Sequence, residues 1–292
     1  MINKFLLKSI LIVFPFLLFA VSSYAQSETE PNDLPAQANV LSLNGSISGA
    51  LNVAGDVDWY KLTTTADGHL FIPFNNTGNG DLKVVSLYDA DTTTVLASSP
   101  VGDGIGMVER NGLAAGTYFI KVNGNSGTET GNYTLSDSLA SPSKANDAEP
   151  NDYINEALTL SLNSSTTGHY GYYYNHYMDT TDWYKVTTNE DGNLYLTLDN
   201  TGNYAVNLYL YDTTGSPVLS SSLGIGGGVG GLHANGLAAG TYYIKITNAG
   251  NNWFGPYTLK DSLAAPSIPN DPESNDNISQ AATLPLNDTA LG

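Results

Sequence analysis

The sequence predicts an all-β protein built from tandem antiparallel β-sandwich domains with a jelly-roll-like order of strands. Three observations support this prediction. The 292 residues include 30 glycines and 19 tyrosines, a composition typical of strands and turns. Apolar and polar residues alternate in short runs that Gly, Asn and Asp interrupt, as they do in half-buried strands. One long unit of sequence occurs twice, so we expect the same domain to form twice.

The first 25 residues predict a secretory signal peptide. Lys4 and Lys8 precede an apolar stretch at 10–21, and Ser23-Tyr24-Ala25 forms a small-x-small cleavage site. The alternative is a membrane anchor, but a spanning helix needs about 20 apolar residues. We therefore expect a secreted protein, either extracellular or on the outer cell surface, with no membrane insertion after signal cleavage.

Composition excludes several classes of function. The formal net charge is −18, from 10 Lys+Arg and 28 Asp+Glu. Such an acidic chain lacks the clustered cations that bind nucleic acid or an anionic membrane. The chain has no cysteine, which excludes disulfides, thiolate catalysis and Cys-based metal sites.

The repeated motifs share their order and spacing. They are Glu-Pro-Asn-Asp at 30–33 and 149–152, Asp-Trp-Tyr-Lys at 58–61 and 182–185, and Asn-Gly-Leu-Ala-Ala-Gly-Thr-Tyr at 111–118 and 235–242. An altered acidic motif at 273–276 begins a third copy. We therefore predict a first sandwich at 26–140, a linker at 141–146, a second sandwich at 147–264, and a linker with the truncated start of a third copy at 265–292. A complete domain of this kind needs more residues than the third copy has, so we expect the sequence to be a fragment of a longer chain.

Within a copy, strands are predicted wherever the period is two. In the run 117–122, the side chains of Tyr118, Ile120 and Val122 should face the core. The other predicted strands of the first copy lie at 58–62, 69–74, 82–88, 94–97, 107–109 and 132–135. A turn or two of helix is predicted at 34–41, capped by Asn32 or Asp33.

The acidic motif is the part of each copy whose residues are suited to a chemical role. Glu28, Glu30 and Asn32 lie on one side of an extended segment, and Asp56 and Asp58 follow at the start of a strand. Calcium takes six to eight oxygen ligands, which a loop and a strand start can supply. Without a cation, converging carboxylates would raise one another's pKa. The alternative is a Pro-Asn-Asp turn with the remaining acids in solvent.

These motifs resemble the bacterial pre-peptidase C-terminal (PPC) domain: Glu-Pro-Asn-Asp, then an Asp-x-Asp-x-Tyr strand, then Leu-Ala-Ala-Gly-Thr-Tyr near the end of the copy. The resemblance covers both full copies and the start of the third. It implies calcium-binding β-sandwiches of the kind appended to secreted peptidases and other hydrolases, with collagen-binding modules among the relatives.

The resemblance also implies the calcium ligands. In the first copy they would be Glu28, Glu30, Asn32, Asp33, Asp56 and Asp58, and in the second Asp147, Glu149, Asn151, Asp152 and Asp182. Thr180 stands where the first copy has Asp56, and Asp179 is the candidate substitute. The third copy keeps Asp271, Glu273, Asn275 and Asp276 but lacks the strand partner, so no complete site is expected there.

An insertion in the second copy holds five tyrosines, Tyr170, Tyr172, Tyr173, Tyr174 and Tyr177, between His169 and Met178. Tyrosines of this kind could bind a glycan or an extended peptide. Alternatively, the insertion is a longer hairpin that covers a sheet edge or packs against the neighbouring domain. A metal site at His169 and His176 is a third interpretation.

No catalytic motif is present: the sequence contains neither Gly-x-Ser-x-Gly nor His-Glu-x-x-His. His69, His169, His176 and His233 have no histidine at the equivalent position of the other copy, and we expect surface residues there. The predicted function is therefore that of non-catalytic, calcium-binding spacer or adhesion modules, with an extracellular protein or glycan as possible partner. Two alternatives are an accessory region of a secreted hydrolase (a peptidase) whose catalytic domain follows residue 292, and a ligand-binding module that uses the tyrosine insertion.

Overall fold

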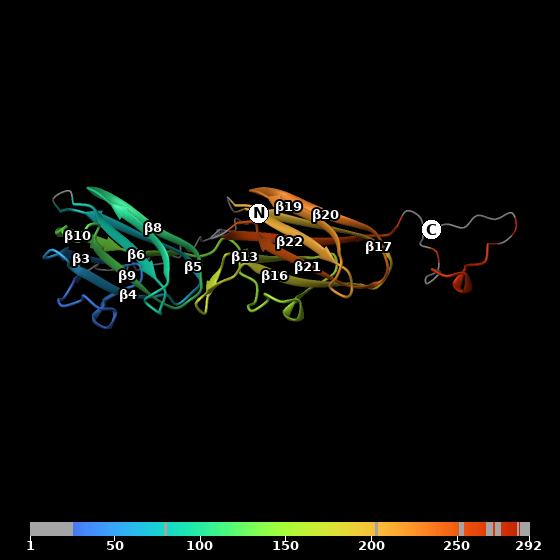
Figure 1. Cartoon of the computed structure of the whole chain (residues 1–292), viewed down its shortest axis with the longest axis horizontal. Helices are drawn as coiled ribbons and strands as arrows, with labels where there is room; N and C mark the ends of the chain where they lie inside the picture. The colour runs from blue at the N-terminus through green and yellow to red at the C-terminus, as the bar shows by residue number, and fades with distance from the viewer. Residues whose placement is uncertain are drawn as a thin grey trace, which may run out of the picture.

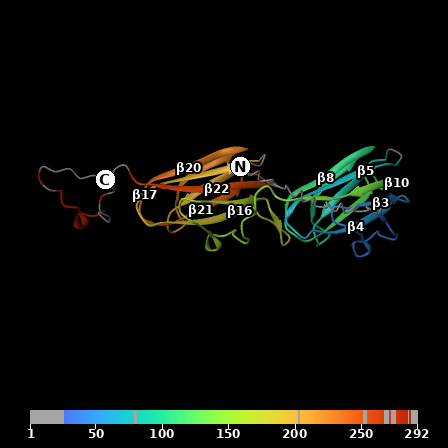
Figure 2. The same cartoon turned by 180° about the vertical axis from the view of Figure 1, so that it is seen from behind.

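Two β-sandwiches lie end to end in the computed structural model (Figures 1 and 2). The structure describes residues 26–78, 81–201, 204–250, 254–266, 271, 276–284 and 286. The predicted signal peptide at 1–25, and Glu273 and Asn275 of the third copy, lie outside these residues. In the described part of the chain, no helix has the length and apolar character needed to cross a membrane.

The first sandwich packs two sheets face to face. One sheet has the order β1 (Gln26–Ser27), β3 (Ser46–Leu51), β10 (Gly131–Ser136), β5 (Gly68–Asn76) and β8 (Gly104–Leu113), and β11 (Ser138–Ala140) also pairs with β5. The other has the order β2 (Asn39–Leu41), β4 (Val57–Thr63), β9 (Thr117–Gly124), β6 (Lys83–Tyr88) and β7 (Val95–Val101).

The second sandwich repeats this plan. One sheet has the order β13 (Ser165–Tyr170), β22 (Gly255–Ala264), β17 (Gly192–Asn200) and β20 (Gly228–Leu237). The other has the order β12 (Leu158–Leu160), β16 (Thr181–Thr188), β21 (Gly240–Asn248), β18 (Val206–Tyr211) and β19 (Val218–Ile225). The register repeats as well, because Tyr60 pairs with Ile120 in the first sandwich and Tyr184 with Ile244 in the second.

Most strand pairs are antiparallel, as predicted, but the short strands near the start of each copy are not. β1 pairs with β3, β2 with β4, and β12 with β16, all in parallel. The helix predicted at 34–41 is also absent, and a single 3₁₀ turn, η1 (Pro35–Gln37), leads into β2 instead. Leu34 occupies the N-cap position without a side-chain cap, so neither Asn32 nor Asp33 caps the turn. The same turn recurs as η2 (Ile154–Glu156) and as η3 (Ile278–Gln280) in the third copy.

Side chains that alternate along the strands form the two cores. Tyr118, Ile120 and Val122 are buried between the sheets, which confirms their predicted orientation. Trp59 points to the opposite face of its sheet and is nevertheless 7% exposed. Its ring packs against Tyr88, with the ring centroids 5.0 Å apart, so each sandwich also covers part of its outer face.

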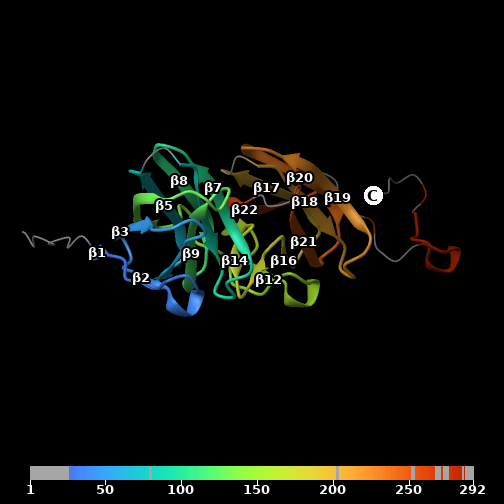
Figure 3. The same cartoon turned by 60° about the vertical axis from the view of Figure 1, so that its left-hand side comes forward.

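The tyrosine insertion connects the two sandwiches. It forms a small hairpin of β14 (Tyr173–Tyr174) and β15 (Tyr177–Met178). β14 extends the sheet of the first sandwich, because Tyr173 pairs in parallel with Leu113 of β8 and accepts a 3.0 Å hydrogen bond from the Ala114 amide. In Figure 3, β14 lies between the two sandwiches.

Candidate functional site

The acidic motif of the first copy folds against the start of β4. Candidate ligand oxygens of Glu28, Glu30 and Asp58 lie within 4.8 Å of one another. Asn32 is fully buried beside them. Its amide nitrogen can donate to Glu30 Oε2 and Asp58 Oδ1, each at 3.0 Å, while its oxygen accepts from Asn39. The structure thus brings three predicted carboxylate ligands together and gives Asn32 the role of a donor to two of them.

Two tyrosines link these carboxylates across the interior. Tyr60 on β4 donates to Glu28 Oε2 at 2.5 Å, and Tyr133 on β10 donates to Asp58. The two hydroxyl oxygens lie 2.6 Å apart. Because β4 and β10 belong to opposite sheets, the tyrosine pair joins the sheets at the acidic cluster.

A glycine opposite Tyr133 makes room for this arrangement. Gly49 on β3 pairs directly with Tyr133. A Cβ atom at Gly49 would lie 2.5 Å from Glu28 Oε2 and 2.5 Å from the Tyr60 hydroxyl. A Cβ at this position would force the Glu28 or Tyr60 side chain to shift, so glycine is favoured where the strand approaches the cluster. Gly168 has the same role in the second copy, where a Cβ would lie 2.3 Å from the Tyr257 hydroxyl.

The second copy builds the equivalent cluster with Asp147 in place of Glu28. Candidate ligand oxygens of Asp147, Glu149 and Asp182 lie within 4.8 Å of one another. Tyr184 donates to Asp147 at 2.5 Å and Tyr257 donates to Asp182 at 2.6 Å. The two tyrosine hydroxyls lie 2.7 Å apart.

The second cluster is more buried than the first, and more of its polar atoms lack a hydrogen-bond partner. Asp182 is 1% exposed, and Asp179, the candidate substitute for the missing Asp56, is 2% exposed. Buried oxygens without a hydrogen-bond partner are found on Asp147, Glu149, Asn151, Asp179 and Asp182. Buried polar atoms are normally paired, and three of these carboxylates, Asp147, Glu149 and Asp182, have ligand atoms close enough together that they could hold a metal ion.

Burial and mutual repulsion raise the pKa values of these acids. Burial, with smaller contributions from Glu28 and Asp56, raises the pKa of Asp58 to about 8. Burial and the neighbouring Asp179 raise the pKa of Glu149 to about 8, and burial raises that of Asp179 to about 7. The pKa of the fully enclosed Asp182 is raised for the same reason. A bound cation would remove this penalty because it favours the charged form.

The remaining predicted ligands lie outside the groups of close ligand atoms found in the described residues. Asp33 is exposed. Asp56 closes the turn between β3 and β4, where its carboxylate accepts from the amides of Asn52 and Val57. Asp152 accepts a 3.3 Å hydrogen bond from the Tyr174 hydroxyl.

The tyrosine insertion is largely internal. Tyr170, Tyr172 and Tyr173 are 1%, 7% and 5% exposed, and Tyr173 belongs to the hydrophobic core of the first sandwich. These three side chains pack within and between the sandwiches, and Tyr172 and Tyr173 each also line a surface pocket. Tyr174 is half-buried, and Tyr177 is 73% exposed.

Polar side chains complete the joint, which is the interface between the two sandwiches. Arg110 on β8, the single arginine of the sequence, is 5% exposed. It donates to the Gly171 carbonyl at 3.1 Å and lies 4.7 Å from the centre of the Phe254 ring. His169, which we expected at the surface, is 2% exposed. The joint is thus a packed interface with buried polar groups.

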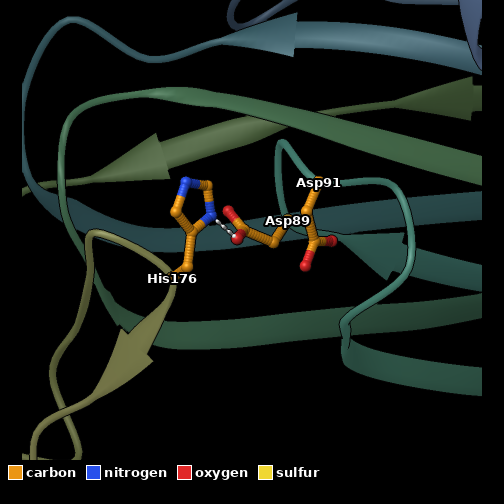
Figure 4. Close-up of side chains that lie close together, drawn as sticks. All are labelled: Asp89, Asp91 and His176. Atoms are coloured by element: carbon orange, nitrogen blue, oxygen red, sulfur yellow. Dashed lines mark hydrogen bonds and ion pairs between the residues drawn. The ribbon is translucent and has the colours of Figure 1, made fainter.

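A third group of close ligand atoms crosses the joint. His176 of the insertion points toward Asp89 and Asp91 in the loop after β6 (Figure 4) and contacts Asp89 through Nδ1. Asp89 also accepts from the Tyr173 hydroxyl at 3.1 Å. Asp91 accepts from the amides of Thr93 and Thr94. These partners satisfy both carboxylates, so the group acts as an inter-domain contact.

Sequence reasoning did not single out the four cluster tyrosines or the two glycines. Tyr60 and Tyr184 are part of the repeated Asp-Trp-Tyr-Lys motif, and Tyr133 and Tyr257 recur at the same offset. The run 58–62 was predicted as a strand, but the face that Tyr60 occupies was not assigned to the core. The recurrence of a polar hydroxyl at an inward position in both copies is the signal that could have identified them.

Comparison with known proteins finds similar folds only. No protein-family model matches the chain, and no curated protein matches it in sequence. The structure is similar to the pre-peptidase C-terminal domain of collagenase from Bacillus anthracis, with 18% identity, a TM-score of 0.31, and coverage of 40% of this chain and 100% of that one. The PBSX exported protein XepA has 10% identity and a TM-score of 0.24, over 74% of this chain and 84% of that one. Tripeptidyl peptidase 2 has 8% identity and a TM-score of 0.28, over 79% of this chain and 24% of that one. Similarities this weak do not bear on function, which has to be argued from the site itself.

Proposed function

We propose that this chain is a non-catalytic accessory region of an exported protein, whose two β-sandwiches bind calcium and act as spacer or adhesion modules. The observation that carries the proposal is the set of buried, unpaired oxygens on Asp147, Glu149, Asn151, Asp179 and Asp182. Leaving buried carboxylates uncompensated is costly. A divalent cation compensates all of them at once.

The donor set favours calcium over other cations. Both clusters supply carboxylate oxygens, Asn151 adds an amide oxygen in the second, and the groups of close ligand atoms there contain no histidine in the described part of the chain. Such hard donors suit calcium, magnesium or manganese, whereas zinc and copper prefer nitrogen or sulfur. Calcium accepts six to eight ligands in a flexible geometry, and magnesium requires a smaller octahedron that keeps several waters.

Calcium would act on the joint more than on the fold. Extracellular modules bind calcium with Kd values of about 0.1–1 mM, and a tenfold excess then stabilises by about 1.4 kcal/mol per site. In the second copy, Asp179 lies at the base of the insertion, since its backbone amide donates to Tyr172 at 2.7 Å and its carbonyl accepts from Gly171 at 2.9 Å. A cation held by the Asp179 carboxylate would therefore fix the hairpin that docks on the first sandwich, stiffen the joint and protect it from proteolysis.

Isothermal titration calorimetry with calcium chloride tests the proposal. We expect two sites in the wild-type chain and one site in each of the variants Asp58→Asn and Asp182→Asn. The variant Glu190→Gln removes an exposed acid of the second copy and should keep both sites. Binding that is unchanged in Asp182→Asn, or absent at about 10 mM calcium, would refute the proposal.

A further inference from the structure

A partly open pocket of about 450 Å³ lies at the joint between the sandwiches. Both sandwiches and the linker contribute to its walls. The polar lining includes His69 and Glu109 from the first sandwich and His169 from the second. Pro142, Tyr204 and Phe254 provide apolar faces. Small-molecule sites are commonly found at domain interfaces, with volumes of roughly 300–1,000 Å³.

One buried side chain in this wall lacks the partners that it needs. His169 is 2% exposed, and neither ring nitrogen has a hydrogen-bond partner. His69 Nε2 is also buried without a hydrogen bond, although it lies 3.4 Å from Glu109 Oε2. Leaving a buried polar group unpaired destabilises the folded state. The cavity therefore offers unsatisfied hydrogen-bonding capacity to whatever fills it.

The charge of the lining restricts the ligand. Burial lowers the pKa of His169 to about 4 and also lowers that of His69, so both rings are neutral at neutral pH. A neutral imidazole has one donor nitrogen and one acceptor nitrogen. Glu109 adds a negative charge, and the described residues of the lining include no Lys or Arg that would attract an anion. A hydroxyl group both donates and accepts, and it can satisfy either imidazole nitrogen.

An extended peptide fits this site less well than a sugar. Peptides commonly gain affinity by adding a strand to a free sheet edge, but β8 is already paired with Tyr173 of the insertion near the joint. The Phe254 and Tyr204 rings and Pro142 instead offer flat apolar surfaces, against which the C–H face of a sugar ring can pack.

We propose that the cavity between the two sandwiches binds a neutral saccharide of one or two sugar units. His69, His169 and Glu109 would hydrogen-bond the sugar hydroxyls, and Phe254 would contact a ring face. This inference goes beyond the calcium proposal and involves none of the acids of the calcium clusters. It also assigns the sugar to the joint and not to the tyrosine insertion.

Calorimetry and saturation-transfer NMR on the calcium-loaded chain test this inference. The probes are cellobiose, lactose and N,N′-diacetylchitobiose, with triglycine as the peptide probe. We expect at least one disaccharide to bind with 1:1 stoichiometry, and we expect Glu109→Gln and His69→Ala each to weaken it about tenfold, the equivalent of one hydrogen bond. Both substitutions are at partly exposed positions, and near-ultraviolet circular dichroism verifies that each variant is folded.

The matched control is His233→Ala. His233 is the counterpart of Glu109 in the second copy and stacks on Tyr195, so its removal should leave the affinity unchanged. The inference is overturned if no disaccharide binds at about 20 mM, if only triglycine binds, or if the two cavity variants bind as tightly as the wild type.

Discussion

The hydroxyl oxygens of Tyr60 and Tyr133 lie 2.6 Å apart between the sheets of the first sandwich, with a carboxylate at either end of the pair. This arrangement makes three short oxygen–oxygen contacts, but two hydroxyl groups supply only two hydrogens. The third contact therefore needs either a further proton, on one of the carboxyl groups, or a cation beside the carboxylate. Burial raises the pKa of Asp58 to about 8, which favours a proton on this carboxyl group. Under the calcium proposal, a bound cation would take the place of this proton.

Removing one hydroxyl from the second cluster should destabilise the protein. Tyr184→Phe deletes the donor to Asp147 but keeps the ring in the core. The loss leaves a buried carboxylate with fewer partners, and we expect a cost of about 1–3 kcal/mol. Urea unfolding measures this cost. Tyr195→Phe, at a 42% exposed position of the same sandwich, should change stability by less than about 0.5 kcal/mol; equal effects of the two variants would contradict the argument.

A methyl group at Gly49 should have a comparable effect in the first sandwich. Gly49→Ala places Cβ 2.5 Å from both Glu28 Oε2 and the Tyr60 hydroxyl. The strand or the tyrosine has to move, and overpacking of this kind costs about 1–3 kcal/mol. Gly102→Ala is the control, since a Cβ there has no neighbour within 4 Å. Thermal unfolding compares the variants, and a Tm for Gly49→Ala equal to that of the control would show that the cluster adapts.

Local sequence patterns predicted the strands but not what covers them. The alternation at 117–122 correctly placed Tyr118, Ile120 and Val122 in the core, because a strand directs side chains to its two faces in turn. The same alternation puts Trp59 on the outer face of its sheet, where Tyr88 of a different strand buries it. The period of two in a strand identifies the face that each side chain occupies. It does not identify the residues of other strands that cover that face. The 3₁₀ turn at Pro35 was misread as helix for a related reason, since so short a segment is defined by the strand that follows it.

The joint shows the same limit more clearly. Repetition identified the insertion around Tyr173 as the departure from the common plan, and packing against the neighbouring domain was one of its interpretations. Nothing local to the insertion indicates that Tyr173 enters the first core or that Arg110 donates to Gly171. These contacts depend on how two folded domains meet, and a single sequence does not encode that relation in a periodic pattern.

Stability without calcium should fall as the pH rises. The pKa of Asp58 is about 8 in the folded state and 3.8 in the unfolded chain, so the folded state binds the proton more tightly. The resulting stabilisation is complete below pH 3.8 and is lost as the pH rises toward 8. In EDTA, we expect a lower Tm at about pH 8.5 than at about pH 6.5, and calcium should reduce the difference.

The matched variant Asp58→Asn isolates this effect. Asparagine cannot titrate, so the variant should lose the part of the pH dependence that comes from the first cluster. The histidines with lowered pKa, His69 and His169, titrate at lower pH and contribute little in this range. A Tm in EDTA that rises between the two pH values, or a variant with the full wild-type dependence, would exclude the assigned protonation.

Arg110 should hold the joint closed. Its guanidinium is 5% exposed and contacts Gly171 and Phe254 of the second sandwich, so Arg110→Ala removes contacts that span the joint and leaves both cores intact. Trypsin cleaves after Lys144 in the linker, where the ammonium group lies 3.4 Å from Asp199. We expect several-fold faster cleavage there in Arg110→Ala and a larger radius of gyration in small-angle scattering. Lys121→Ala removes the same type of contact, with Trp59, within the first sandwich and should leave both measurements unchanged. If Arg110→Ala is cleaved no faster than the control, the stiffness of the joint resides in the docked hairpin and its hydrogen bonds to Asp89, and not in the arginine.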